Sequence, residues 1–157
     1  MMTLKTMTRP MCHEFYREFQ NDPAIYADMS RFSEFVYDPV WVDAYFDRQM
    51  EKGRLLFAVL ADGAMVGEVK FHSIDRESKE CSLGIHLRND SVKGKGYGTQ
   101  AEQLAAEYAF HVLGMDAVNA DVILKNTRSQ HVLEKVGFRF VREDEMYRYY
   151  RLEKAKK

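Results

Sequence analysis

Several features that mark specialised classes of protein are scarce or absent in this chain. It has two cysteines in 157 residues, Cys12 and Cys81, which stand far apart and form neither a metal-binding motif nor a disulfide framework. We therefore expect two reduced thiols. No apolar run approaches the ~20 residues that a membrane-spanning helix needs, and residues 1–11 lack the apolar segment of a signal peptide. We expect a cytoplasmic protein without a membrane partner.

An excess of charge of one sign is also missing. The net charge is −1, so the chain has no general basic field for holding nucleic acid, and nucleic acid is not an expected partner. Apolar residues make up 46% of the chain and aromatic residues 13%, which excludes a disordered chain. Only three prolines are present, and no linker rich in proline, glycine or serine interrupts the sequence. These observations predict one folded domain.

The acidic residues are unevenly distributed along the chain. Residues 11–51 contain nine acids and three bases, which gives this segment a net charge of −6. Such a segment is suited to attract a cationic ligand, although solvated helix surfaces would give the same pattern. The acids are Glu14, Glu18, Asp22, Asp28, Glu34, Asp38, Asp43, Asp47 and Glu51.

Hydrophobic periodicity and turn signals predict the order of strands and helices. We expect strands over residues 4–8, 54–61, 64–74, 79–87, 117–124, 138–141 and 146–152. We expect helices over residues 11–20, 40–50, 98–112 and 127–136. The three-strand meander over 54–87 excludes a doubly wound parallel sheet. The strand–helix–strand unit over 80–124 implies one parallel pair, so the predicted fold class is α+β with a mixed sheet.

The most specific local feature is a glycine-rich loop between a strand and a helix, where residues 93–99 read Lys-Gly-Lys-Gly-Tyr-Gly-Thr. Alternate glycines let the backbone approach a ligand closely, and the exposed N–H groups of a helix N-terminus bind anionic oxygens. The loop therefore predicts a phosphate or pyrophosphate cradle. It is not a Walker loop, because Gly96 follows Gly94-Lys95 where serine or threonine is needed, and the dinucleotide fingerprint fails at Tyr97. A glycine-rich turn without a ligand is the alternative.

A second motif follows at a fixed distance. Asn126 stands at the end of a predicted strand, and residues 134–138 read Glu-Lys-Val-Gly-Phe after the next helix. Together with the glycine loop, this pattern resembles the GNAT N-acetyltransferases, whose acyl-CoA loop reads Arg/Gln-x-x-Gly-x-Gly/Ala. Lys93 stands where that family has arginine or glutamine. Within the family, the chain is most similar to the ribosomal-protein alanine acetyltransferase (RimJ/RimL-type) branch.

The resemblance implies a GNAT-like sheet of about six to seven mostly antiparallel strands, with a splayed parallel pair and about four flanking helices. It implies acetyl-CoA as co-substrate, held between the strands at 79–87 and 117–124, and no metal. Asn126 and Ser129 match positions near the pantetheine or thiol end, and Lys125, Arg128 and Lys135 are candidates to contact the 3′-phosphate. The implied cofactor-binding residues are Ile85, His86, Leu87, Lys93, Gly94, Lys95, Gly96, Tyr97, Gly98, Thr99, Asn126, Ser129 and Lys135.

The implied chemistry needs a base for the amine and an acid for the leaving thiolate. Asp121 precedes Asn126 on the second splayed strand and is one candidate base. The second candidate comes from strand arithmetic: a hairpin centred at Glu77 pairs Glu68 with His86, so Glu68 could orient His86 for proton transfer near neutral pH. Leu133 occupies the position where many family members carry a tyrosine acid, so Ser129, a nearby tyrosine or water would have to substitute.

The expected activity is transfer of an acetyl group to a primary amine in a ternary complex. The acceptor would be a small cationic amine or a peptide N-terminus, which enters over residues 1–53. Residues 54–138 would form the acyl-CoA-binding core and residues 139–157 the closing strands. Leu133 keeps open the alternative of a non-catalytic acyl-CoA-binding or sensing domain, and a regulator that binds ATP on the same loop is a third reading. The resemblance is compatible with a homodimer.

Overall fold

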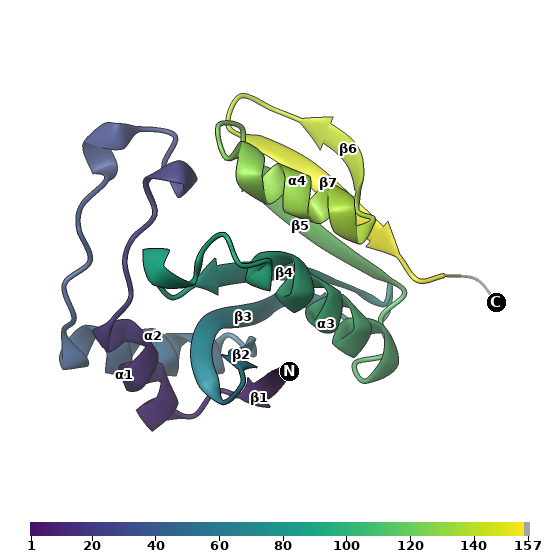
Figure 1. Ribbon diagram of the computed structural model, residues 1–157. Coiled ribbons are helices and arrows are strands. Elements are labelled where there is room, and N and C mark those ends of the chain that lie inside the picture. Colours follow the sequence, from purple (N-terminus) through teal and green to yellow (C-terminus); the bar gives the residue numbers. More distant parts are fainter. Residues whose placement is uncertain (156–157) are drawn as a thin grey trace.

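The computed structural model describes residues 1–155, apart from the side chain of Asp90. Seven strands form one sheet, flanked by four α-helices (Figure 1). The strands are β1 (Met2–Thr6), β2 (Leu55–Ala61), β3 (Ala64–Asp75), β4 (Glu80–Leu87), β5 (Ala117–Ile123), β6 (Arg139–Glu143) and β7 (Tyr147–Glu153). The helices are α1 (Arg9–Arg17), α2 (Pro39–Glu51), α3 (Tyr97–His111) and α4 (Thr127–Val136). No helix within residues 1–155 is both long and apolar enough to cross a bilayer.

The sheet has the order β1-β2-β3-β4-β5-β7-β6, and only β4 and β5 run parallel among the paired strands. The mixed α+β class is therefore confirmed. The β2–β3 hairpin closes through Asp62 and Gly63, which both adopt positive φ values, 50° and 85°. This turn matches the right-handed twist of the two strands.

The parallel pair is short, and its two strands then separate. Only Glu80–Ala117, Cys81–Val118 and Ser82–Asn119 are paired between β4 and β5. Beyond these residues β4 stays on β3, and β5 stays on β7. The facing edges of β4 and β5 therefore diverge, and the predicted splay is confirmed.

A polar cluster stands at the closed end of the splay. Arg151 Nη1 donates to Glu80 Oε1 at 2.6 Å, and Asn119 Nδ2 donates to the same oxygen at 3.1 Å. These three side chains come from β7, β4 and β5, so the cluster joins both halves of the sheet. The Arg151 guanidinium, followed by the Asn119 amide, lowers the pKa of Glu80, which keeps the carboxylate charged.

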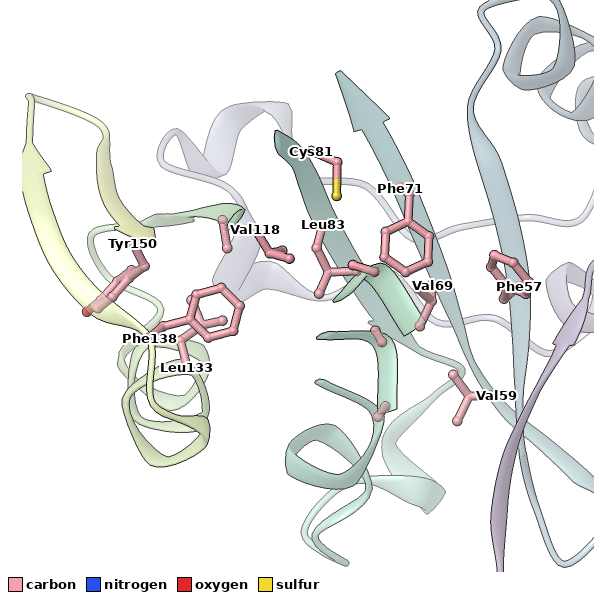
Figure 2. Packing of buried hydrophobic residues seen from close by; sticks show 14 of the residues in the cluster. Phe57, Val59, Val69, Phe71, Cys81, Leu83, Val118, Leu133, Phe138 and Tyr150 are labelled. Carbon is pink, nitrogen blue, oxygen red and sulfur yellow. The ribbon is translucent and has the colours of Figure 1, made fainter. Parts of the chain in front are cut away.

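Two apolar cores cover the two faces of the sheet. Helices α3 and α4 cover one face, where the buried residues extend from Phe57 on β2 to Tyr150 on β7 (Figure 2). Helices α1 and α2 cover the other face of the β1–β3 side, with Phe15 and Val42 fully buried. The opposite face of β5 and β7 has no such helix over it in Figure 1.

The N-terminal boundaries differ from those predicted. The strand ends at Thr6 rather than residue 8, because the Thr8 side chain accepts a hydrogen bond from Met11 N and caps α1. Pro10 occupies the first turn of α1, where a missing N–H has no cost. Helix α4 covers Thr127–Val136 as predicted, with Asn126 and Gly137 at its ends.

The connection between α1 and α2 is more ordered than the sequence pattern indicates. It contains two short 3₁₀ turns, Pro23–Ile25 and Met29–Arg31. Asp22 and Asp28 cap these turns through their side chains. The connection rises beside the open end of the splay (Figure 1), and its first turn contacts β5. It therefore forms a wall of the region described next.

Candidate active site

The splay of β4 and β5 contains a cavity of about 260 Å³, which we call the splay cavity. Its walls include Leu83–His86 of β4, Ala120–Ile123 of β5, and Leu133 of α4. A second cavity of about 120 Å³, the loop cavity, lies beside the glycine-rich loop. The two cavities share six lining residues: Ile25, Ile85, His86, Glu102, Asn126 and Ser129. They therefore form adjoining parts of one elongated site.

The glycine-rich loop has the backbone shape that an anion cradle needs. Gly94 and Gly96 have φ values of +78° and +77°, a region that side-chain-bearing residues rarely adopt. Gly96 is the N-cap of α3, and Gln100 N donates to its carbonyl. The N–H groups of the three residues between them, 97–99, are therefore the unpaired donors of the helix N-terminus. Gly98 itself lines the loop cavity.

The basic residues around this loop differ in their position. Lys93 lines the loop cavity, and its ammonium lies 3.3 Å from the Asp22 carboxylate. Lys95 is exposed. Arg128, in the first turn of α4, also lines the loop cavity, whereas Lys135 is exposed in the last turn of that helix and does not line it. The cation on α4 that faces the cavity is thus Arg128 rather than Lys135.

Asn126 and Ser129 both line the two cavities. Asn126 Oδ1 accepts a hydrogen bond from Ser129 N and so fixes the start of α4. Ile85, His86 and Leu87, the predicted backbone partners of the pantetheine arm, line the loop cavity along the diverging part of β4.

The predicted pairing of Glu68 with His86 is confirmed as a cross-strand register, but no hydrogen bond joins these side chains in residues 1–155. Glu68 is fully buried and instead accepts from the hydroxyls of Tyr45, at 2.7 Å, and Tyr16, at 3.3 Å. His86 packs against the edge of Phe19. Burial, with the charge of Lys70, lowers the pKa of His86 to about 4. The expectation of a His86 relay that Glu68 orients near neutral pH is therefore wrong.

Asp121 lines the splay cavity and is exposed to solvent. The structure brings it together with His72 of β3, which the sequence reading did not single out, because β3 and β5 are not neighbours in the sheet. Burial and the nearby Arg54 charge lower the pKa of His72, while the Asp121 carboxylate opposes that shift. His72 is thus a neutral imidazole at pH 7, able to accept a proton.

Glu102 was also missed, and it is the most unusual group in the site. It is 7% exposed, it lines both cavities, and its Oε2 has no hydrogen-bond partner in the described structure. Burial raises the pKa of Glu102 to about 8. The signal that could have found it is its place on α3, because it shares the buried face of Ala105, Ala106 and Ala109.

Leu133 is 1% exposed and belongs to the core that covers the α3 and α4 face. It lines the splay cavity with an aliphatic side chain, which can neither donate nor accept a proton. Any acid for this cavity must come from another residue or from water.

Acidic side chains of residues 11–51 form hydrogen bonds and ion pairs with nearby groups of the protein. Asp22, Asp28 and Asp38 each accept a hydrogen bond from a nearby backbone N–H. Asp43 pairs with Arg9 at 3.1 Å. These contacts explain the positions of four of the nine acids without a ligand.

The site fits acetyl-CoA on its own geometry. Diverging strand edges leave backbone groups on β4 that an elongated amide-containing ligand can pair with, and the α3 N-terminus presents donors to an anionic group. The unpaired Glu102 oxygen supplies a polar partner within the cleft. Within residues 1–155, no group of histidine, cysteine and acidic side chains is arranged to hold a metal ion.

Comparisons with known proteins agree with this geometry. The probable N-acetyltransferase YjcK of Bacillus subtilis is 33% identical over 78 residues, which are 50% of this chain and 43% of that protein. The spermidine N(1)-acetyltransferase of Escherichia coli is 28% identical over 96 residues, which are 61% of this chain and 51% of that protein. The chain thus matches about half the length of these curated relatives.

The same fold occurs in solved structures. The spermidine N-acetyltransferase of Vibrio cholerae, crystallised in complex with CoA and spermine, aligns with a TM-score of 0.79 over 97% of this chain and 95% of that chain, at 18% identity. In addition, residues 2–139 match the family described as the acetyltransferase (GNAT) domain. This match agrees with the glycine-rich loop and the splayed strands, and the chain therefore belongs to the GNAT acetyltransferase family.

Proposed function

We propose that this protein transfers an acetyl group from acetyl-CoA directly to a primary amine. The observation that carries the proposal is the continuity of the site: the splay of β4 and β5 opens next to the glycine-rich N-terminus of α3. One end of the site can hold a pyrophosphate while the other holds a thioester, so two substrates can be held together in reacting geometry.

Residues of the loop cavity would hold the nucleotide end of acetyl-CoA. The amides of Tyr97, Gly98 and Thr99 face the pyrophosphate in this arrangement, with Lys93 and Arg128 as the nearby cations. The pantetheine arm would pair with the backbone of β4 around Ile85–Leu87 as an added strand. A backbone N–H of β4 would stabilise the charge that develops on the thioester oxygen.

His72 and Asp121 would remove the proton from the incoming ammonium group. Both line the splay cavity. Their chain neighbours Phe71, Ala120 and Val122 belong to the core under α3 and α4. We therefore place His72 and Asp121 on the opposite face of the sheet. His72 accepts the proton because it is neutral at pH 7, and the Asp121 carboxylate stabilises the imidazolium that forms. This step leaves a neutral amine, which can attack the carbonyl carbon.

A small cationic amine or a peptide N-terminus fits this approach. Asp121 brings an exposed carboxylate to the lining of the splay cavity, and the relatives named for spermidine act on a small polyamine. The similarity to a putative ribosomal N-acetyltransferase, YdaF of Bacillus subtilis, at 28% identity, keeps a peptidyl acceptor of the RimJ/RimL type within the proposal. We further propose a cytoplasmic enzyme, with residues 1–53 on the acceptor side.

Acetyl-CoA binding is the first test. We expect calorimetric titration to give micromolar affinity for the wild-type protein and none for Gly96→Glu. Gly114→Glu is the matched control, because Gly114 has a similar φ of +74° with open space around it but lies outside both cavities. Equal loss of binding in both variants, or no binding by folded wild-type protein, would refute the cofactor assignment.

The acceptor half of the site can be tested separately at Gly84. This glycine of β4 lines the splay cavity, and an added side chain there meets no atom within 4 Å. We expect Gly84→Val to keep acetyl-CoA affinity and to raise the KM for the amine at least tenfold. Turnover is measured over a panel of polyamines, aminoglycosides and short peptides. Saturable acetyl-CoA binding with no turnover on any of them would favour the non-catalytic sensing domain that Leu133 suggests.

A further inference from the structure

Glu102 has a position that neither packing nor electrostatics explains. A buried carboxyl group costs free energy unless donors satisfy it. Glu68, the other buried acid, accepts hydrogen bonds from two tyrosine hydroxyls, whereas Glu102 Oε2 has no partner in the described structure. An alanine at this position would continue the apolar face of α3 at no such cost.

The surroundings of Glu102 assign it to the site rather than to the core. It lines the splay cavity together with Ser129 and Leu133, and it also lines the loop cavity. The charged or titratable groups that line these two cavities with it are Asp22, His72, His86, Lys93, Asp121, Arg128 and Tyr147. None of these makes a hydrogen bond to Glu102 in residues 1–155, and burial alone accounts for its raised pKa.

We propose that Glu102 is a catalytic residue that donates a proton to the coenzyme A sulfur as the thioester breaks. The inference rests on the proposed function. Leu133 and Glu102 line the same splay cavity, and Glu102 is the one of the two whose side chain can carry a proton. At neutral pH this group carries its proton, because its pKa is about 8.

The step balances in the following way. The neutral amine attacks the carbonyl carbon, and a C–N bond forms. The C–S bond then breaks, sulfur takes the bonding electron pair, and the Glu102 O–H proton moves to sulfur. The products are the amide and the free thiol. The nitrogen gives up its remaining extra proton, directly or through water, to the Glu102 carboxylate, which restores the acid.

The experiment that tests proximity needs no acceptor. CoA is bound to the wild-type protein, to Glu102→Gln and to Glu107→Gln, and the ultraviolet absorbance of the thiolate is followed against pH. Glu107 is the matched control because it is an exposed glutamate on the same helix. A carboxylate beside the sulfur disfavours the thiolate, so removing it lowers the pKa of the bound thiol. We expect a fall of about one unit or more in Glu102→Gln and no change in Glu107→Gln.

Kinetics then separate proton donation from simple binding. We expect Glu102→Gln to lower kcat about 10- to 100-fold at pH 7, with the KM for acetyl-CoA changed less than about twofold. The fall of wild-type kcat above pH ~8, where Glu102 loses its proton, should be absent from the residual activity of the variant. If the thiol pKa of bound CoA is the same in all three proteins, the role of Glu102 is overturned and the proposed function is not. Loss of acetyl-CoA affinity in parallel with kcat would have the same consequence. Failure of folded wild-type protein to bind CoA would overturn the proposed function as well.

Discussion

Two buried carboxyl groups, Glu68 and Glu102, lie on opposite faces of the sheet and differ in the hydrogen-bond donors around them. Glu68 is held by the hydroxyls of Tyr16 and Tyr45 between the sheet and helices α1 and α2. Glu102 lines both cavities, and its Oε2 has no donor in the described structure. We therefore assign Glu68 to the stability of the fold and Glu102 to the reaction, and a separate prediction follows from each assignment.

The hydroxyl of Tyr45 should be needed for stability. Tyr45→Phe leaves a buried carboxyl oxygen without its 2.7 Å donor, so we expect a loss of about 1–3 kcal/mol in the free energy of unfolding. Urea denaturation measures this loss. Tyr108→Phe is the control, since Tyr108 stacks on Phe71 and its hydroxyl makes no hydrogen bond within residues 1–155. Equal effects in the two variants would mean that the Glu68 contact contributes nothing.

Glu102 should make stability depend on pH in a defined direction. Its folded-state pKa of about 8 lies above the usual 4.5, so the folded protein binds more protons than the unfolded chain between these values. Its contribution is therefore full below pH 4.5 and is lost as pH rises through 8. We expect the stability of Glu102→Gln relative to wild type to increase by about 2–4 kcal/mol from pH 5 to pH 8. A difference that does not vary with pH would contradict a buried, protonated Glu102.

At the scale of single elements, helix α4 depends on its N-cap. Asn126→Ala removes the acceptor for Ser129 N, and we expect it to lower the free energy of unfolding by about 1 kcal/mol. Asn126→Asp keeps an acceptor of the same size and should retain wild-type stability within about 0.5 kcal/mol. Thermal denaturation of the two variants measures the change in stability. A similar loss of stability in both variants would show that the N-cap hydrogen bond does not stabilise α4.

The elements themselves were largely predictable, because their signals are local. Helix α4 has a capping asparagine before it and a glycine after it, and its bounds came out as predicted. The Glu68–His86 register followed from the length of one hairpin, and it holds although the ladder shifts between His72 and Asp75. The two turns between α1 and α2 were missed because each is a single turn, capped by an aspartate that composition alone assigns to surface charge.

The site was predictable only where backbone geometry makes it. The glycine-rich loop and the splayed strands belong to motifs that occur at a fixed spacing in the sequence. Side chains that come together from distant strands have no such motif. His72 and Asp121 line the same cavity although their strands, β3 and β5, are separated by β4 in the sheet. Glu102 differs from an ordinary surface glutamate only in the face of α3 that it occupies.

At the scale of the whole molecule, an ion pair links the segment between α1 and α2 to the glycine-rich loop. Asp22 Oδ2 lies 3.3 Å from Lys93 Nζ. If Lys93 serves the pyrophosphate, Asp22 competes for it. We expect Asp22→Asn, which can still cap the first 3₁₀ turn, to lower the Kd for acetyl-CoA about two- to fivefold at low salt.

The matched control for this change is Asp28→Asn, which alters the same charge at the second turn, away from the loop. Calorimetry at low and high salt provides the measurement. Since salt screens a partly exposed pair, the gain in affinity should shrink at high salt. Tighter binding in both variants would indicate a general effect of net charge and not a contact with Lys93.

The sheet is joined in its middle at three residue pairs between β4 and β5, reinforced where Glu80 meets Arg151 and Asn119. Beyond these pairs the facing edges of the two strands are not paired with each other, while the core under α3 and α4 continues across both parts of the sheet. A long, narrow ligand that pairs with the free edge of β4 would therefore act as a strut between the two parts of the sheet.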